Sequence, residues 1–457
     1  MIGPDGPPLD VTATGELPFW ERRGWWAQTG RAGVAVLIAS VYAFLATVVA
    51  ARALGPHDYG LVVLALSAVA SVATFLDFSL EEAVIHYAAR AITAKDHGTV
   101  RALLATSIRI DVLVGVAVFA ALALAAGPIA SVIVRGGISP TLIRLAALEA
   151  LAITIDGTTG ATLMLSRRPE LRAWCFAWTN ALRLGAVVLA SNIGSAGPDK
   201  ILIAYVSASA IGSITQAVVA RRIARRRWGT GPRRRSPVGL RTLVWFGMHS
   251  STTTTIIAVR ATLISVVLGR IAGAPAVGIF AVALLPLTLA QVASAPLRIT
   301  MFPEQATLAA EGRIDVLRRA VVGYTRVALA VALVAAALGW FVLPRLLSAL
   351  FAHAFEGALV PARIMLIPAV VSLTTAWSKS LPSAVGRPQV RTWISVVELG
   401  LTGVMLAALG SRGVIGAAWA IAITSVVVGL IWVVVTQRVL RRLTPGPSTR
   451  DTQAEAP

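Results

Sequence analysis

Two arginines lie inside long apolar runs of this sequence, where an unpaired charge would be costly in a membrane. Arg183 and Arg260 each fall within an apolar stretch of about twenty residues, the length that spans a bilayer. A guanidinium group is planar and donates paired hydrogen bonds that match the oxygens of a phosphate. The sequence therefore makes Arg183 and Arg260 candidates for holding a phosphate or diphosphate group in a polar cavity.

Other charged and polar residues can line the same cavity. The remaining candidates are Arg109 and Asn180 within the apolar runs, and Arg52 and Arg270 in the turns that follow two of the runs. Acidic residues within the runs are Glu149, Asp156 and Glu398. Two interpretations stay open for these three carboxylates, namely coupling to a proton or cation and internal pairing with arginines, for example Glu149 with Arg183.

No pattern of residues indicates catalysis or a bound metal. The five histidines are widely spread, at His57, His86, His97, His249 and His353, and no two have the helical spacing of a metal pair. The sequence also lacks the Gly-Lys-Ser/Thr of a nucleotide-binding loop. We therefore expect no enzymatic activity, no metal and no cofactor.

The composition is typical of a membrane protein with many spans. The 457 residues are 56% hydrophobic and only 14% charged, and the mean hydropathy is +0.77. The formal net charge of +20 does not indicate nucleic-acid binding, because the arginines lie in short segments between apolar runs.

About twelve apolar runs are long enough to cross a bilayer, and all of them predict helices. They lie near 31–51, 60–80, 105–126, 142–165, 172–193, 200–220, 243–268, 277–300, 322–346, 359–380, 391–410 and 414–436. Arginines concentrate in every second connecting segment, and such segments face the cytoplasm. We therefore expect both termini in the cytoplasm.

A repeat divides the chain into two halves. Arg52, Gly55 and Gly60 match Arg270, Gly273 and Gly278 at an offset of 218 residues. The motif Arg-Pro-x-x-Arg-x-Trp also occurs twice, at 168–174 and 387–393, an offset of 219. Two six-helix halves in the same orientation are a transporter architecture with the substrate site between them.

The predicted organisation follows from this repeat. It comprises a cytoplasmic segment at 1–30, an N-lobe at 31–220, a basic cytoplasmic linker at 221–242, a C-lobe at 243–436 and a cytoplasmic tail at 437–457. The fold class is all-α, with about twelve membrane helices in two parallel six-helix lobes.

The stretch Ala51-Arg-Ala-Leu-Gly-Pro-His-Asp-Tyr-Gly60 resembles the signature after the first helix of bacterial polysaccharide flippases, the O-antigen and teichoic-acid type. They belong to the multidrug, oligosaccharidyl-lipid and polysaccharide exporter superfamily. The resemblance implies a V-shaped carrier in the bacterial inner membrane that works by alternating access. It implies that undecaprenyl-diphosphate-linked oligosaccharides are flipped to the outer leaflet for cell-surface polysaccharide synthesis. It also implies contact with membrane lipid and with polysaccharide polymerase and glycosyltransferases. Arg260 departs from the family pattern, in which an acidic residue is often found in this region.

Two other functions remain as alternatives. The same scaffold suits a cation-coupled exporter of small molecules, which would need a less cationic cavity. A membrane-embedded glycosyl- or lipid transferase would need a large extramembrane loop with acidic residues for metal-diphosphate chemistry. The segments between the apolar runs are too short for such a loop, which argues against the transferase.

Overall fold

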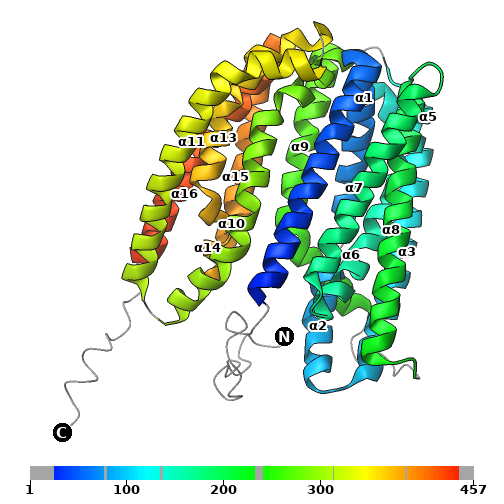
Figure 1. Ribbon diagram of the computed structural model, residues 1–457, viewed down its shortest axis with the longest axis vertical. Coiled ribbons are helices and arrows are strands. Elements are labelled where there is room, and N and C mark those ends of the chain that lie inside the picture. The colour runs from blue at the N-terminus through cyan, green and yellow to red at the C-terminus, as the bar shows by residue number, and fades with distance from the viewer. Residues whose placement is uncertain are drawn as a thin grey trace.

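A computed structural model describes residues 25–76, 80–133, 137–231, 240–311, 313–351, 353–385, 387 and 389–441. Within these ranges every regular element is a helix. Figure 1 shows two groups of long helices that lie close together at one end of the molecule and diverge toward the other. The all-α, two-lobed fold predicted from the sequence is thereby confirmed.

We call the helices before residue 232 the first lobe and those after residue 239 the second. The first lobe comprises α1 (Trp25–Leu76), α2 (Leu80–Thr93), α3 (His97–Leu124), α4 (Ala126–Ile133), α5 (Pro140–Ala147), α6 (Glu149–Leu165), α7 (Pro169–Asn192) and α8 (Pro198–Trp228). The second comprises α9 (Leu240–Ala283), α10 (Leu285–Ala310), α11 (Ile314–Phe351), η1 (His353–Ala358), α12 (Leu359–Ile364), α13 (Leu366–Thr374), η2 (Ala376–Lys379), α14 (Leu381–Ala384), α15 (Gln389–Leu409), η3 (Gly410–Arg412) and α16 (Gly413–Arg441).

Seven helical stretches of the described chain are long and apolar enough to cross a membrane, or eight if the bent pair His353–Ile364 and Leu366–Thr374 counts as one span. Three of the seven are about twice as long as one crossing requires. These are Gly30–Ala73, Thr255–Ser294 and Gln389–Leu440. Each contains a glycine with positive φ, a conformation that L side chains rarely adopt.

Those glycines account for most of the difference between the seven long helical stretches and the twelve predicted crossings. Gly55, Gly273 and Gly413 divide the three long stretches into two crossings each. The bent pair His353–Ile364 and Leu366–Thr374 adds one crossing. Helices α5 and α6, which are separated only by an interruption at Leu148, together add another. Within the described residues, helices thus overlap each of the twelve predicted runs.

The two turns of the repeat have the same backbone conformation. Gly55 has φ 71° and ψ 175°, and Gly273 has φ 80° and ψ 176°. A proline follows in both turns, at Pro56 and Pro275, where its missing N–H costs nothing at the start of a new helix. The sequence repeat is therefore also a structural repeat at these two turns.

Helix α8 does not end where its apolar run ends. It continues from the predicted span through Trp228, so the first part of the predicted linker 221–242 is helical. At the same end of the molecule, α16 continues to Arg441. Residues 1–24, 232–239 and 442–457, and also Pro388 of the second Arg-Pro motif, lie outside the described residues.

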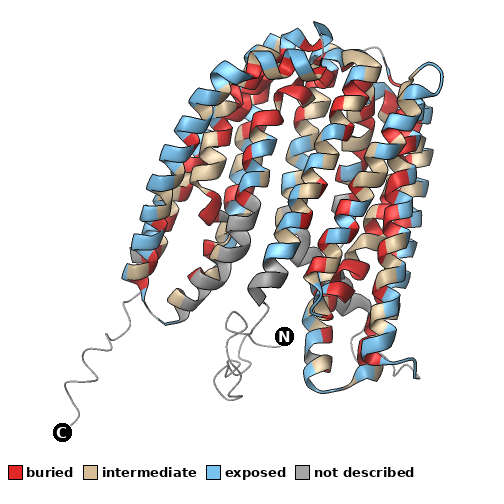
Figure 2. Ribbon diagram, in the orientation of Figure 1, coloured by how far each residue is buried: buried red, intermediate tan, exposed pale blue. Residues whose placement is uncertain are grey.

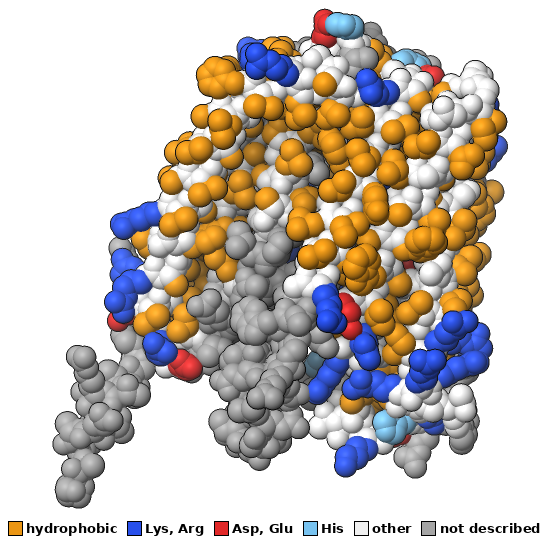
Figure 3. All heavy atoms as spheres, viewed as in Figure 1, with side chains coloured by type: hydrophobic (Ala, Val, Ile, Leu, Met, Phe, Trp, Pro, Cys, Tyr) orange, Lys and Arg blue, Asp and Glu red, His pale blue; other side chains and the backbone are white. Residues whose placement is uncertain are grey.

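The outward faces of the helices are apolar. On α11 the exposed side chains Val327, Val331, Val334, Leu338 and Phe341 recur every three or four residues and form one stripe. Figure 2 shows exposed residues on the outside of both lobes and buried ones toward their interiors. Figure 3 shows hydrophobic side chains over most of the visible face, with Lys and Arg gathered mainly toward its two ends. Such a surface suits lipid rather than water.

Candidate functional site

Arg183 of α7 is held by groups from two other helices of the first lobe. Its Nη2 donates to Ser209 Oγ of α8 at 2.8 Å and lies 3.3 Å from Glu149 Oε1 at the start of α6. The guanidinium also lies over the ring of Tyr205, 5.0 Å from the centroid. Ser209 donates to the same Glu149 oxygen at 2.7 Å. This geometry agrees with the interpretation that Glu149 neutralises Arg183.

Not every polar atom of this cluster is used. Arg183 Nε and Glu149 Oε2 are buried and have no hydrogen-bond partner among the residues that the structure describes. The Arg183 side chain is 24% exposed and that of Glu149 is 14% exposed. The cluster thus has unused hydrogen-bonding capacity, and Arg183 remains partly accessible.

Arg260 of α9 is paired in the second lobe. Its Nη1 forms a hydrogen-bonded ion pair with Glu398 Oε1 of α15, and both side chains are about one quarter exposed. Each of the two candidate arginines is therefore matched by one carboxylate within its own lobe. Both arginines are thus neutralised by a carboxylate while their side chains stay partly accessible.

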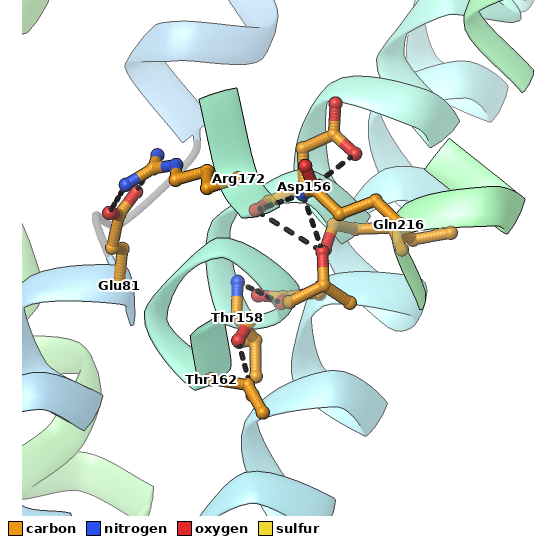
Figure 4. A network of polar contacts seen from close by, with 9 residues as sticks. Glu81, Asp156, Thr158, Thr162, Arg172 and Gln216 are labelled. Carbon is orange, nitrogen blue, oxygen red and sulfur yellow. Dashed lines mark hydrogen bonds and ion pairs between the residues drawn. The ribbon is translucent and has the colours of Figure 1, made fainter. Parts of the chain in front are cut away.

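Asp156 is hydrogen-bonded but not ion-paired. Gln216 Nε2 lies 3.4 Å from Asp156 Oδ1 and donates to the backbone oxygen of Asp156 at 3.2 Å and to Thr159 Oγ1 at 2.9 Å. Figure 4 shows the Gln216 side chain directed at Asp156. Among the described residues no Lys, Arg or His nitrogen lies within ion-pair distance of the Asp156 carboxylate. No basic side chain of the described residues therefore neutralises the Asp156 carboxylate directly.

An ion pair that the sequence analysis missed joins α2 to α7. Arg172 binds Glu81 through both Nη atoms, one of them at 2.9 Å from Glu81 Oε2. Figure 4 shows the Arg172 guanidinium pointing away from Asp156 and toward Glu81. Gly160 makes room for this arginine, because a Cβ there would lie 2.9 Å from Arg172 Nε. Glu81 lies just after an apolar run. An acidic residue at the end of a span is the feature of the sequence that could have indicated this ion pair.

The other predicted site residues do not join these clusters. Arg109 is exposed on the same face of α3 as the exposed Val112 and Val116, which is a lipid-type surface. Asn180 is 2% exposed, and its amide donates to Phe176 O of its own helix at 2.9 Å. Arg52 and Arg270, near the two glycine turns, are both exposed.

The two lobes contact each other through the repeated glycines. A Cβ at Gly60 would lie 1.9 Å from Ala274 O, and a Cβ at Gly278 would lie 2.1 Å from Pro56 O. The contact is reciprocal, because Ala274 and Gly278 follow Pro56 and Gly60 by 218 residues. Only glycine permits such a close approach between the two backbones.

Further contacts between the lobes lie beside these turns and farther along α1 and α9. The hydroxyls of Ser71 and Thr262 are hydrogen-bonded, and Thr262 Oγ1 donates to Ser67 O at 2.9 Å. Beside the turns, the ring of Tyr59 packs edge-on against Phe355, with 6.4 Å between centroids. In Figure 1 this end of the molecule is opposite the end at which the described chain begins and finishes. The lobes are therefore closed at the end away from Trp25 and Arg441.

Comparison with solved structures identifies the fold. An inward-facing multidrug resistance MATE family transporter of the MOP superfamily superposes with a TM-score of 0.71 at 16% identity, covering 90% of this chain and 99% of that one. An outward-facing conformation of such a transporter gives 0.64 at 15% identity, with 91% and 96% covered. A MOP superfamily transporter from Pyrococcus furiosus, reported to have a binding pocket of reversed polarity, gives 0.65 at 14% identity with the same coverage.

Sequence comparison identifies the family. No curated protein matches the chain. A family model described as polysaccharide biosynthesis protein matches residues 26–306, which is more than half of the sequence. With the fold of the MOP transporters and this match together, the chain belongs to the polysaccharide biosynthesis protein family, a family of membrane transporters.

Proposed function

We propose that this protein moves a polyprenyl-diphosphate-linked oligosaccharide, with undecaprenol as the expected carrier, from the inner to the outer leaflet of the cell membrane. The observation that carries the proposal is the presence of Arg183 and Arg260 within spans, one in each lobe of a polysaccharide-biosynthesis transporter. Both arginines are partly exposed and each has one exchangeable carboxylate partner. The diphosphate of the carrier lipid is an anion that guanidinium groups bind well.

The proposed cycle exchanges one anion for another. In the empty state Glu149 and Glu398 neutralise the arginines, so neither lobe carries an unpaired cation in the membrane. When the diphosphate enters, the arginines turn to it and the carboxylates are released toward the accessible side. Closure at one end and opening at the other then exposes the bound sugar to the opposite leaflet.

The proposal also includes the orientation of the protein in the membrane and its partner enzymes. We place both termini and the arginine-rich segments in the cytoplasm, because positive charge is retained on that side. The cargo is made by glycosyltransferases on the cytoplasmic face, and a polysaccharide polymerase uses it on the other. These enzymes are the expected partners.

A cation-coupled exporter of small molecules is the second candidate, because the solved structures that share the fold include multidrug transporters. At 14–16% identity, this similarity shows a shared fold and does not show which cargo is transported. The two candidates differ in the charge of the cargo, since paired arginines suit an anionic lipid and would disfavour cationic drugs.

Reconstitution in vesicles tests the proposal. Purified protein is inserted in liposomes that contain a short-chain polyprenyl-diphosphate oligosaccharide with a fluorescent sugar, and a membrane-impermeant quencher is added. We expect the protected fraction to become quenched at least about tenfold faster than in protein-free vesicles, because the polar sugar crosses a bare bilayer very slowly. If the lipid-linked sugar stays protected while a fluorescent organic cation crosses, the cargo is a small molecule.

Replacing Asp156 with Asn is expected to uncouple transport from an ion gradient. Asparagine keeps the size of the side chain and an oxygen for Gln216 but cannot take up a proton or a cation's charge. We expect the stimulation of quenching by an imposed proton or sodium gradient to fall about tenfold, the effect of losing one proton-binding or cation-binding step. Thermal unfolding should shift by only a few degrees, because no ion pair is broken. Undiminished stimulation in the Asp156→Asn protein would exclude Asp156 as the coupling group.

A further inference from the structure

A hollow of about 530 Å³ lies at the end of the molecule where α8 finishes, within the first lobe and away from both arginine–carboxylate pairs. Its walls come from the α6–α7 connection, the start of α7 and the last three turns of α8. Its cationic side chains are Arg168, Arg222, Arg226 and Arg227. Its apolar side chains are Leu171, Val219 and Ile223.

Within the part of the chain that the structure describes, two of the four arginines are held by other groups of the protein and two are not. Arg227 donates to the Ser166 carbonyl at 2.6 Å, and Arg168 lies 3.5 Å from Glu170. Arg222 and Arg226 have no carboxylate within ion-pair distance among the described residues. They stand one turn apart on one face of α8, where like charges repel each other. An anion in the hollow would remove this repulsion.

The hollow lies at the level where a bilayer changes from hydrocarbon to headgroups. α8 has 31 residues and is about 46 Å long, whereas the hydrocarbon core is about 30 Å thick. Its last turns, which carry the arginines, therefore extend beyond the core. Figure 3 shows Lys and Arg side chains gathered over this part of α8, with hydrophobic side chains above them.

Apolar side chains continue from the hollow toward the membrane centre. On α7, Trp174 and Trp178 follow Leu171 at helical spacing and are 45% and 49% exposed. On α8, Ile214 and Val218 precede the arginines and are 63% and 44% exposed. The site thus joins a cationic recess to an exposed apolar surface, which fits a lipid better than a soluble phosphate.

We infer that this hollow binds the headgroup of an anionic phospholipid, whose acyl chains lie along the exposed faces of α7 and α8. The phosphate is held by Arg222 and Arg226, with Arg168 and Arg227 at the rim, and the glycerol region rests on the apolar wall. The inference does not depend on which cargo the protein carries, because this surface lies outside the paired arginines of the proposed transport site.

Lipid titration followed by native mass spectrometry tests the inference with matched variants. Arg222→Gln/Arg226→Gln removes the two unpaired charges of the hollow. Arg221→Gln/Arg225→Gln removes two exposed charges with the same spacing on the same helix but outside the hollow. We expect the first variant to bind dioleoyl phosphatidylglycerol about thirtyfold more weakly than the parent protein, since each basic residue near a membrane surface contributes to binding anionic lipid. The second variant should bind as the parent does.

Three outcomes would overturn the inference. Equal losses in both variants would show diffuse charge attraction instead of a site. No loss in Arg222→Gln/Arg226→Gln would show that the lipid binds elsewhere. Displacement of the lipid by millimolar inorganic pyrophosphate, which has no acyl chains, would show a soluble-phosphate site. Dioleoyl phosphatidylcholine gives the baseline, and similar thermal unfolding of the three proteins in it shows that all are folded.

Discussion

Replacing Gly60 or Gly278 with Ala is expected to force the lobes apart at their closed end and to reduce transport at least about tenfold. The added methyl group would lie 1.9 Å from Ala274 O in the first case and 2.1 Å from Pro56 O in the second. Neither neighbour is a flexible side chain, so the two helices must separate. Overpacking of this kind costs about 1–3 kcal/mol, which is enough to shift a two-state equilibrium tenfold or more.

Spin labels can follow this separation directly. The exposed residues Arg52 and Arg270 adjoin the two turns and accept labels as cysteines, on a Cys175→Ala background that removes the chain's one thiol. We expect the distance distribution between the labels to shift to longer values in Gly60→Ala and Gly278→Ala. Gly185→Ala is the matched control, because a Cβ at Gly185 meets no atom within 4 Å. Unchanged distances and transport in the Gly60 and Gly278 variants would show that the contact does not control opening.

Neutralising Arg260 and neutralising Glu398 are expected to have very different effects, although the two side chains form one ion pair. Arg260→Gln removes the proposed diphosphate ligand and leaves Glu398 unpaired, so we expect transport to fall about a hundredfold. Glu398→Gln leaves a guanidinium that the anionic cargo can neutralise, so transport should stay within about tenfold of the parent rate. Arg260→Lys should restore only part of the activity, because an ammonium lacks the planar fork.

The vesicle assay distinguishes this role from a structural one. Arg183→Gln and Glu149→Gln form the equivalent comparison in the first lobe and should show the same asymmetry. If Glu398→Gln is as inactive as Arg260→Gln, and the double variant regains transport, then the pair only neutralises itself. Immunoblots and thermal unfolding establish that each variant is present and folded.

Hydropathy and the repeat predicted much of the fold, because bilayer thickness fixes the length of a span and a reversal needs a recognisable turn. Gly55 and Gly273 were identifiable from their matching sequence context. The far end of α8 was not, because a helix can continue into water after its apolar run ends, as α8 does through Trp228.

The site was less predictable than the fold. Arg172 and Glu81 lie 91 residues apart, and only the tertiary fold, in which α2 packs against α6, brings them together. When a helix is apolar on all sides, its sequence does not show which face points toward the protein interior. The sequence therefore groups Arg109 with the cavity, whereas the structure places it on an exposed face with Val112. By contrast, the pairing of Glu149 with Arg183 is one of the two interpretations that the sequence leaves open, because few opposite charges are available within the spans.

The reciprocal contact between the glycine turns has the form of an isologous interface between identical subunits. Gly60 meets the segment that begins at Ala274, and Gly278 meets the segment that begins at Pro56, as residues do across the twofold axis of a homodimer. A polypeptide of half this length would therefore carry both partners of the contact. Two copies inserted in the same orientation could close against each other as the lobes do here. In the present chain the arginine-rich connection after α8 would then serve to hold the two halves together and not to shape their interface.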